Sequence, residues 1–268
     1  MHQWRLFFTA LEYFTRWPKP RWVGHDPVWL GPCMRYFPAV GLLVGACGAA
    51  VCGVAAMWWP APVAVVLSTA ATLLITGAFH EDGFADVCDG LGGSRDREQA
   101  LVIMTDSRIG AFGAIGIGVM LLLKFACLAA LRPEHAMVAI VCAHVVSRAA
   151  PLSLMVALPY AKPRSDSKAK PVAQGMRWTE WAIGTSSAAL VMGVTGALAW
   201  HVDGSPTQAA CWLVVLAASF VAAIASAAPL AAWFRARLGG YTGDCLGAAQ
   251  QVSELVFYLC FSAMLDAH

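Results

Sequence analysis

Charged residues are scarce in this chain. Only 13% of its 268 residues are Asp, Glu, Lys or Arg, whereas 59% are hydrophobic and the mean hydropathy is +0.64. No polar segment exceeds about 35 residues, which is too short to fold as a separate soluble domain. No repeat of 20 to 50 residues and no inverted repeat of the kind found in many transporters is visible. These absences exclude a water-soluble enzyme and a solenoid, and they indicate an integral membrane protein.

Paired cysteine motifs are also missing. The chain has nine cysteines but no Cys-x-x-Cys, and most of them fall inside apolar stretches. We therefore interpret the cysteines as small apolar fillers and expect neither a zinc site nor a disulfide framework. The first 37 residues lack the pattern of a cleavable signal peptide, and Trp4 to Phe14 is typical of a helix that lies in the membrane interface.

What the chain does contain is a series of apolar segments of about 20 residues, the length that crosses a bilayer as a helix. Seven are predicted, near 38–58, 61–79, 111–131, 135–157, 180–200, 208–233 and 250–266. Glycines crowd several of them (Gly41, Gly45 and Gly48; Gly113, Gly116 and Gly118; Gly193 and Gly196), as expected where helices pack closely in lipid. The predicted fold is an all-α, polytopic membrane bundle of about seven transmembrane helices that forms a single domain over 1–268.

The distribution of positive charge predicts the orientation. Fifteen of the eighteen Lys and Arg residues fall in four segments on one side of the predicted spans, residues 1–37, 80–110, 158–179 and 235–249. The links on the other side carry Arg132 alone. By the positive-inside rule, the amino terminus is cytoplasmic, and the three later segments are expected to be cytoplasmic active-site loops.

The most informative motif is the acidic, glycine-rich stretch HEDGFADVCDGLGG at residues 80–93. If the preceding apolar helix continues past Phe79, then Asp82, Asp86 and Asp89 project from one helical face. Three neighbouring carboxylates repel one another unless a cation lies between them, and oxygen ligands suit Mg²⁺. A metal site is therefore favoured over a merely solvated acidic loop.

Two further glycine-containing motifs lie on the same predicted side. The sequence DSRIGAFG (106–113) begins a span, where Asp106 or Ser107 can cap the helix and Arg108 requires an anion nearby. The sequence GGYTGDCLG (239–247) leads into the last span with exposed backbone donors and one acid. Such a turn suits phosphate or metal binding better than a plain interhelical link. Its candidate ligands are Gly240, Thr242, Gly243 and Asp244.

The remaining candidate site residues are basic. The loop Pro159 to Trp178, which contains Lys162, is either a positive-inside determinant or a phosphate-binding segment. Arg148 lies inside the predicted fourth span, close to His144, and an intramembrane arginine implies an anionic partner. Lys124 in the third span has a simpler interpretation, because a lysine side chain can extend to the membrane surface. Carboxylates for Mg²⁺ beside cations and N–H groups for phosphate indicate transfer between phosphate esters.

The three motifs, together with FTRWPKP (14–20) and YFPAVGLLVGA (36–46), closely resemble the cobalamin synthase family in order and over nearly the whole chain. The resemblance implies that adenosylcobinamide-GDP is joined to α-ribazole or its 5′-phosphate with release of GMP, as the last step of nucleotide loop assembly. It implies Mg²⁺ on Asp82, Asp86 and Asp89, phosphate oxygens on Arg108, Arg148 and Lys162, and Asp244 beside the metal or the nucleophile. Asp106 or His80 would act as the base. Glu81 departs from the family pattern and is not expected to bind metal.

Three alternatives are weaker. A CDP-alcohol phosphotransferase would require Ala-Arg where Ala85-Asp86 stands, and a prenyltransferase would need a second Asp-rich motif. An ion-coupled transporter would place acids near the middle of the membrane. The expected setting is the bacterial inner membrane, with the lipid bilayer as a partner, no nucleic acid, and a homo-oligomer left open.

Overall fold

The computed structural model describes residues 1–161, 175–203 and 206–265. Over these ranges the chain consists of α-helices and short 3-10 turns and has no β-strand, apart from an isolated bridge between Tyr160 and Tyr241. The predicted all-α class is confirmed.

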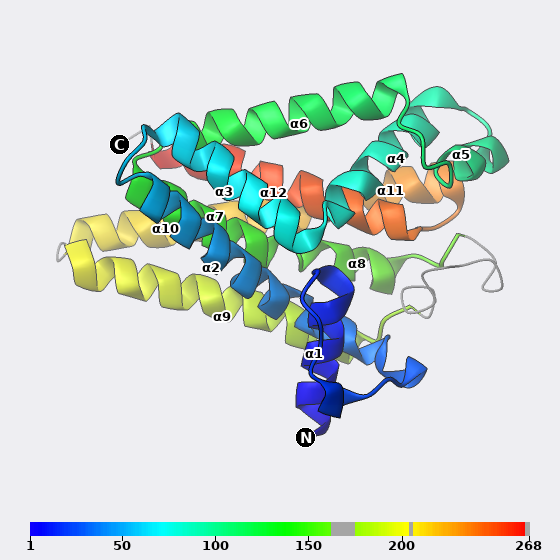
Figure 1. Cartoon of the computed structure of the whole chain (residues 1–268), viewed down its shortest axis with the longest axis horizontal. Helices are drawn as coiled ribbons and strands as arrows, with labels where there is room; N and C mark the ends of the chain where they lie inside the picture. Colours follow the sequence, from blue (N-terminus) through cyan, green and yellow to red (C-terminus); the bar gives the residue numbers. More distant parts are fainter. Residues whose placement is uncertain (162–174, 204–205, 266–268) are drawn as a thin grey trace.

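Long helices run side by side and form the body of the molecule (Figure 1). They are α2 (Phe37–Ala55), α3 (Ala61–Thr76), α6 (Ala111–Ala129), α7 (Pro133–Val146), α9 (Trp178–Asp203), α10 (Pro206–Ala225) and α12 (Gly243–Leu265). Two of them continue after short breaks, α7 into α8 (Ala150–Ala157) and α10 into α11 (Ala227–Leu238). In the described part of the chain, six helical segments are long and apolar enough to cross a membrane, or seven if one bent pair is a single span. This agrees with the predicted bundle.

The bent pair corrects one expectation. The apolar helix does not continue past Phe79, because α3 ends at Thr76 and α4 (Phe79–Gly93) starts at an angle of 89° to it. Gly77 and Ala78 both adopt left-handed conformations at this break, with φ of 69° and 55°. Glycine does so without steric cost, whereas a positive φ at alanine is uncommon. The acidic motif nevertheless lies on one continuous helix, since α4 contains all three aspartates.

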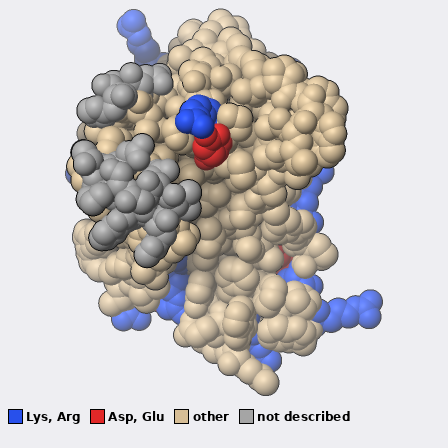
Figure 2. All heavy atoms as spheres, turned by 90° about the vertical axis from the view of Figure 1, so that its left-hand side faces the viewer, with Lys and Arg blue, Asp and Glu red and all other residues tan. Residues whose placement is uncertain are grey.

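Polar elements gather at one end of the bundle. Figure 1 shows α4, α5 (Arg97–Ile103), α8 and α11 at this end, and α1 (His2–Phe14) crossing the direction of the long helices. The segments 80–110 and 235–249, which were predicted as loops, are therefore largely helical. At the opposite end, Figure 2 shows a face with very little charge, and on the described short link there Arg132 pairs with Glu134. The predicted charge asymmetry is present in the folded bundle.

The first helix is amphipathic, as predicted for an interfacial helix. Leu6, Ala10 and Phe14 are buried at intervals of four residues, whereas Trp4 and Glu12 are exposed. This spacing places one apolar stripe against the bundle. Three 3-10 turns, Arg21–Val23, Pro27–Trp29 and Pro32–Tyr36, then lead the chain into α2.

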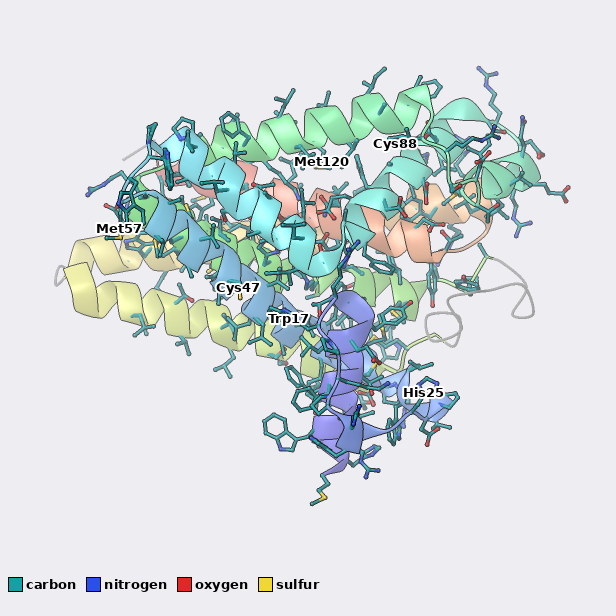
Figure 3. All side chains as sticks on the ribbon, in the orientation of Figure 1. Trp17, His25, Cys47, Met57, Cys88 and Met120 are labelled. Atoms are coloured by element: carbon teal, nitrogen blue, oxygen red, sulfur yellow. The ribbon has the colours of Figure 1, made fainter. Side chains whose placement is uncertain are left out.

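Small residues allow the helices to approach closely. A Cβ on Gly45 would lie 3.0 Å from the Val141 Cα of α7, and one on Gly116 would lie 2.6 Å from the Cys88 Sγ of α4. Gly118 and Gly193 have no such neighbour, so the packing prediction is wrong for those two. No disulfide links the described cysteines; Cys47 and Cys88 lie within α2 and α4 (Figure 3).

Candidate functional site

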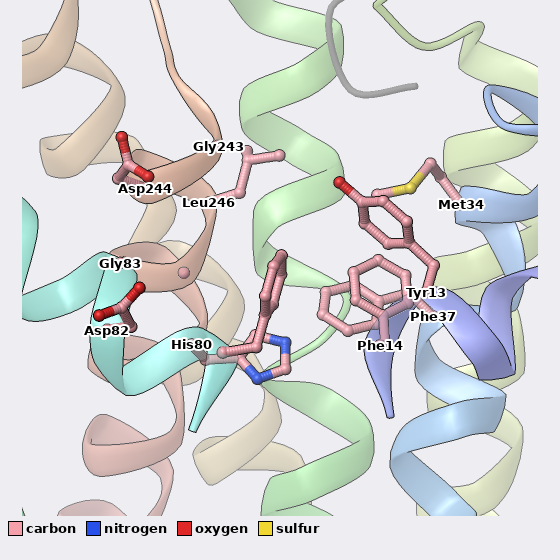
Figure 4. Close-up of a pocket in the computed structure, with 12 residues that line it drawn as sticks. Tyr13, Phe14, Met34, Phe37, His80, Asp82, Gly83, Gly243, Asp244 and Leu246 are labelled. Carbon is pink, nitrogen blue, oxygen red and sulfur yellow. The ribbon is translucent and has the colours of Figure 1, made fainter. Parts of the chain in front are cut away.

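A cavity of about 310 Å³ opens at the polar end, where α1, α2, α4 and α12 meet (Figure 4). Glycines bring α4 and α12 together beside it. A Cβ on Gly83 would lie 3.1 Å from the Asp244 backbone, and one on Gly247 would lie 3.0 Å from the His80 carbonyl oxygen. The lining residues are Tyr13, Phe14, Met34, Phe37, Phe79, His80, Asp82, Gly83, Gly243, Asp244, Leu246 and Gly247.

Two predicted site acids line this cavity from different helices. Asp82 on α4 is exposed, Asp244 at the start of α12 is half-buried, and Figure 4 shows their carboxylates on the same side of the cavity. The Thr242 hydroxyl donates to Asp244 Oδ2 at 3.1 Å and accepts from the Cys245 N–H at 3.3 Å, so it also caps α12. The structure therefore brings together Asp82 and Asp244, which are 162 residues apart in sequence.

The donor set suits Mg²⁺, although no group of three or more His, Cys, Asp or Glu side chains poised to hold a metal occurs in the described part of the chain. Mg²⁺ is usually held by one or two carboxylates, with waters and substrate phosphates completing its shell. Asp82 presents one carboxylate to the cavity, and Asp244 lines the cavity beside it. Asp86 is half-buried one turn beyond Asp82 on the same helix.

Asp89 is held differently from the other two aspartates of α4. Its carboxylate accepts the Gly110 N–H at 2.7 Å and the Gly113 N–H at 2.8 Å, at the start of α6. Close approach requires glycine at both positions, because a Cβ there would overlap the Asp89 carboxylate. The positive end of α6 thus receives a protein carboxylate as its anion.

The segment 106–108 does not line the cavity. Arg108 donates to the Asp106 carboxylate, with Nη2 2.6 Å from Oδ2, and its side chain is 87% exposed. These hydrogen bonds lower the pKa of Asp106 to about 2. In this conformation Asp106 is a weak base, and the anion beside Arg108 is Asp106 itself. Ser107 is exposed.

Arg148 is buried behind the cavity wall. Its Nη1 donates to the His144 carbonyl at 2.7 Å and lies 3.0 Å from His144 Nδ1, while its guanidinium lies over the Phe37 ring at 5.6 Å. These hydrogen-bond partners are neutral, and the charges of the buried acids Glu254 and Glu81 also act on the guanidinium. Arg148 supports Phe37 by a cation–π contact.

The GGYTGD turn is built into the protein interior. Tyr241 N–H donates to Pro159 O at 3.0 Å, and Ala161 N–H donates to Tyr241 O at 2.8 Å. Gly240 allows this pairing, because a Cβ there would overlap Pro159 O. Thr242 is fully buried, whereas Gly243 lines the cavity. Lys162, also predicted to bind phosphate, lies outside the described residues.

The inner wall of the cavity is aromatic, which sequence reasoning missed. Phe14 and Phe37 stack at 3.8 Å with 16° between their planes, and the His80 ring lies within 18° of both. The His80 side chain turns toward these rings and away from the Asp82 carboxylate (Figure 4). Burial raises the pKa of Tyr13 to about 12, and the neighbouring Cys33, Tyr160 and Asp244 add to the shift. Tyr13 is therefore a neutral donor at the rim. The available signal was Phe14 in FTRWPKP, since α1 crosses this end of the bundle.

A second polar cluster, the buried network, lies among the long helices. Lys124 of α6 is 3.0 Å from Glu254 Oε1 and donates to Gln251 Oε1 at 2.6 Å. Gln251 donates to Glu81 Oε1 at 2.8 Å, and Gln250 donates to Glu254 Oε2 at 2.8 Å and Ser147 Oγ at 2.9 Å. Lys124 is only 6% exposed, so it pairs internally and does not extend to the membrane surface. An acid and a base in separate apolar segments were the available signal.

Comparisons with known proteins converge on one family. The family model described as cobalamin-5-phosphate synthase matches residues 6–262. The chain is 48% identical to an adenosylcobinamide-GDP ribazoletransferase of Leptothrix cholodnii, over 97% of this chain and 95% of that protein. It is 47% identical to the enzyme of that name from Ralstonia pickettii, over 94% and 93%. The corresponding Shewanella frigidimarina protein is 40% identical over 98% and 96%. No solved structure matches the chain.

Proposed function

The chain belongs to the cobalamin-5-phosphate synthase family, and from this premise we propose that it joins adenosylcobinamide-GDP to α-ribazole or α-ribazole 5′-phosphate. The products are adenosylcobalamin or its 5′-phosphate and GMP. The observation that carries the proposal for this site is that Asp82 and Asp244 lie together on one side of a cavity, next to an aromatic wall. The CDP-alcohol, prenyltransferase and transporter alternatives lack comparable support.

In the proposed reaction, a ribose hydroxyl oxygen bonds to the phosphorus that carries the aminopropanol arm. The bond from that phosphorus to the GMP oxygen breaks, and GMP leaves. Asp244 accepts a hydrogen bond from the attacking hydroxyl and takes its proton. The Thr242 hydroxyl holds the Asp244 carboxylate in place for this role. Most of the catalysis is expected from positioning and charge stabilisation, as in other phosphoryl transfers.

Asp82, with Asp86 one turn beyond it on α4, would hold Mg²⁺ against the substrate diphosphate, next to Asp244 on the same side of the cavity. When bound, the ion supplies positive charge that stabilises the phosphate oxygens and the leaving group. The Asp89 carboxylate already accepts two backbone N–H groups, so we assign it to orienting α6. Arg108 is exposed near the same end of the bundle and would reach a phosphate oxygen after exchanging its Asp106 partner. Lys162 keeps its sequence-based assignment to phosphate.

The long apolar helices support an integral membrane location, and the Leptothrix and Ralstonia relatives are bacterial proteins. We assign the protein to the inner membrane with the cavity facing the cytoplasm. The charge bias supports this assignment, since most Lys and Arg residues belong to the segments at the polar end. Nucleotide substrates would then reach the cavity directly. A homo-oligomer is compatible with this arrangement.

The test is release of GMP by the purified protein in detergent or lipid vesicles, supplied with adenosylcobinamide-GDP, α-ribazole and MgCl₂. We expect stoichiometric formation of GMP and the joined corrinoid, loss of both on chelation with EDTA, and recovery on adding Mg²⁺. Absence of GMP from protein that is folded by circular dichroism would refute the proposed function.

The matched variant is Asp86→Asn, which removes one charge from the proposed metal-binding face and preserves side-chain shape. Turnover should fall strongly while membrane insertion and thermal unfolding stay unchanged. Wild-type turnover in this variant would remove Asp86 from the metal assignment. Full EDTA resistance of the wild-type protein would remove the metal itself.

A further inference from the structure

The aromatic wall of the cavity forms a flat, buried surface. Phe14, Phe37 and His80 have nearly parallel rings, and their side chains are between 2% and 3% exposed. Tyr13 and Phe79 stand at the rim with their ring centroids 5.8 Å apart and their planes at 73°. Phe79 is 44% exposed, so part of its ring is accessible at the rim. Such a wall favours a flat aromatic ligand.

The size and polarity of the cavity limit the ligands that it can hold. Its volume of about 310 Å³ is at the lower limit of pockets that enclose a small-molecule ligand. A bicyclic base with its ribose fits this space, whereas a corrin macrocycle is far larger. A guanine base carries several donors and acceptors on its edge, and these would lose their hydrogen bonds against phenylalanine rings. A benzimidazole nucleoside has one ring nitrogen with an available lone pair and otherwise an apolar edge.

One polar atom in the aromatic wall matches that single nitrogen. His80 Nε2 is buried and has no hydrogen-bond partner in the described part of the chain. A neutral imidazole can place its proton on Nε2 and donate it to a ring nitrogen. The acids Asp82 and Asp244 line the same cavity, so a ribose attached to a base at the aromatic wall would extend toward them.

We propose that the cavity lined by Tyr13, Phe14, Phe37, Phe79 and His80 is the base-binding site of the nucleoside substrate. It takes the flat, apolar bicyclic base of α-ribazole and excludes bases with polar edges. In this assignment His80 is a specificity-determining residue that binds the base, and Asp244 keeps the role of proton acceptor. The inference rests on the proposed function and names which of its two substrates enters the cavity.

The main experiment measures KM separately for the two substrates in rim variants. Phe79→Leu and Tyr13→Leu should raise the KM for α-ribazole roughly tenfold to a hundredfold, the effect of removing an aromatic stacking partner from a base. The KM for adenosylcobinamide-GDP should stay within about twofold. Trp4→Leu is the matched control, because Trp4 is an exposed aromatic on the same helix as Tyr13 but away from the cavity. It should leave both KM values unchanged.

A second measurement uses the wild-type protein and so does not depend on the folding of a variant. Free 5,6-dimethylbenzimidazole should inhibit competitively against α-ribazole and not against adenosylcobinamide-GDP. His80→Leu should raise the KM for α-ribazole and leave that for adenosylcobinamide-GDP within about twofold, since the ring nitrogen of the base loses its hydrogen-bond donor.

The outcomes separate the inference from the function on which it rests. Competition between dimethylbenzimidazole and adenosylcobinamide-GDP, or a KM increase confined to that substrate, would place the GDP-bearing molecule in the cavity and overturn the inference alone. Unchanged KM values for α-ribazole in an active Phe79→Leu protein would do the same. No GMP release from the folded wild-type protein would overturn both.

Discussion

Two polar regions lie within one helical turn of each other and are organised in opposite ways. In the cavity, Asp82 and Asp244 face space large enough for a ligand. In the buried network, Lys124, Glu254 and Gln251 are bonded to one another. Both regions are built on α4 and α12, and the adjacent residues Glu81 and Asp82 belong to different ones. Successive residues on a helix point about 100° apart, so Glu81 turns into the buried network while Asp82 lines the cavity.

The difference follows from the surroundings of the charges. Within the apolar bundle an ionised group without a partner is very costly, so the network stabilises the fold only as a paired set. At the polar end, water solvates carboxylates until a substrate or a metal replaces it. We therefore expect removal of network charges to lower stability, and removal of cavity charges to lower activity.

The largest effect on stability is expected from Glu254→Ala. It leaves the Lys124 ammonium buried without its carboxylate, and breaking a buried ion pair in this way costs about 3 to 5 kcal/mol. The free energy of unfolding in mixed detergent micelles measures the loss. The double variant Lys124→Met with Glu254→Leu should be clearly more stable than Glu254→Ala. Equal stability of the two would show that the pairing is not what holds α6 against α12.

The cavity should behave in the opposite way. Asp82→Asn keeps the shape of the side chain but removes its charge, so the rate of GMP release should fall roughly 10²- to 10³-fold. Because Asp82 is exposed, the free energy of unfolding of the variant should differ from that of the wild-type protein by no more than about 0.5 kcal/mol. A variant that loses stability in proportion to activity would contradict the separation of the two regions.

Asp89 provides a further test of the comparison. It belongs to the same acidic, glycine-rich motif as Asp82, but its carboxylate is bound by backbone N–H groups and does not line the cavity. Asp89→Asn weakens the hydrogen bonds to Gly110 and Gly113 and removes a charge from the amino end of α6, which should cost about 1 kcal/mol. Turnover should fall less than tenfold. If turnover instead falls as far as in Asp82→Asn at unchanged stability, Asp89 binds the metal.

The smallest effect is expected at the exposed pair of Asp106 and Arg108. The hydrogen bonds of this pair lower the pKa of Asp106 to about 2. The ionised carboxylate therefore stabilises the folded protein above its unfolded pKa of about 4, and this stabilisation is lost as the pH falls through about 2. Between pH 6 and 8, Asp106→Asn should lower the unfolding temperature only slightly, because the pair is exposed to solvent, and should leave the pH profile of turnover unchanged. Loss of the acidic limb from that profile would restore Asp106 as the general base.

Local patterns in the sequence predicted the helices correctly, because the lengths of the apolar segments match a bilayer. Asp82 and Asp244 were singled out because acids beside glycines stand out in an apolar chain, and the fold places both at one cavity. The break at Gly77 and Ala78 escaped prediction, because the residues around it are as apolar as the helix itself. The same is true of the aromatic wall, since Phe14 and Phe37 look like ordinary membrane residues until α1 folds across the end of the bundle.

The sequence by itself determined the membrane class, the number of long helices and the side on which polar chemistry gathers. These depend on composition and periodicity along the chain. Tertiary structure alone decided that Lys124 pairs with Glu254, that Asp89 caps α6, and that His80 joins the aromatic wall instead of the acids. The physical reason is that each of these depends on which helices become neighbours, and close packing at glycines such as Gly83 and Gly247 sets those neighbours.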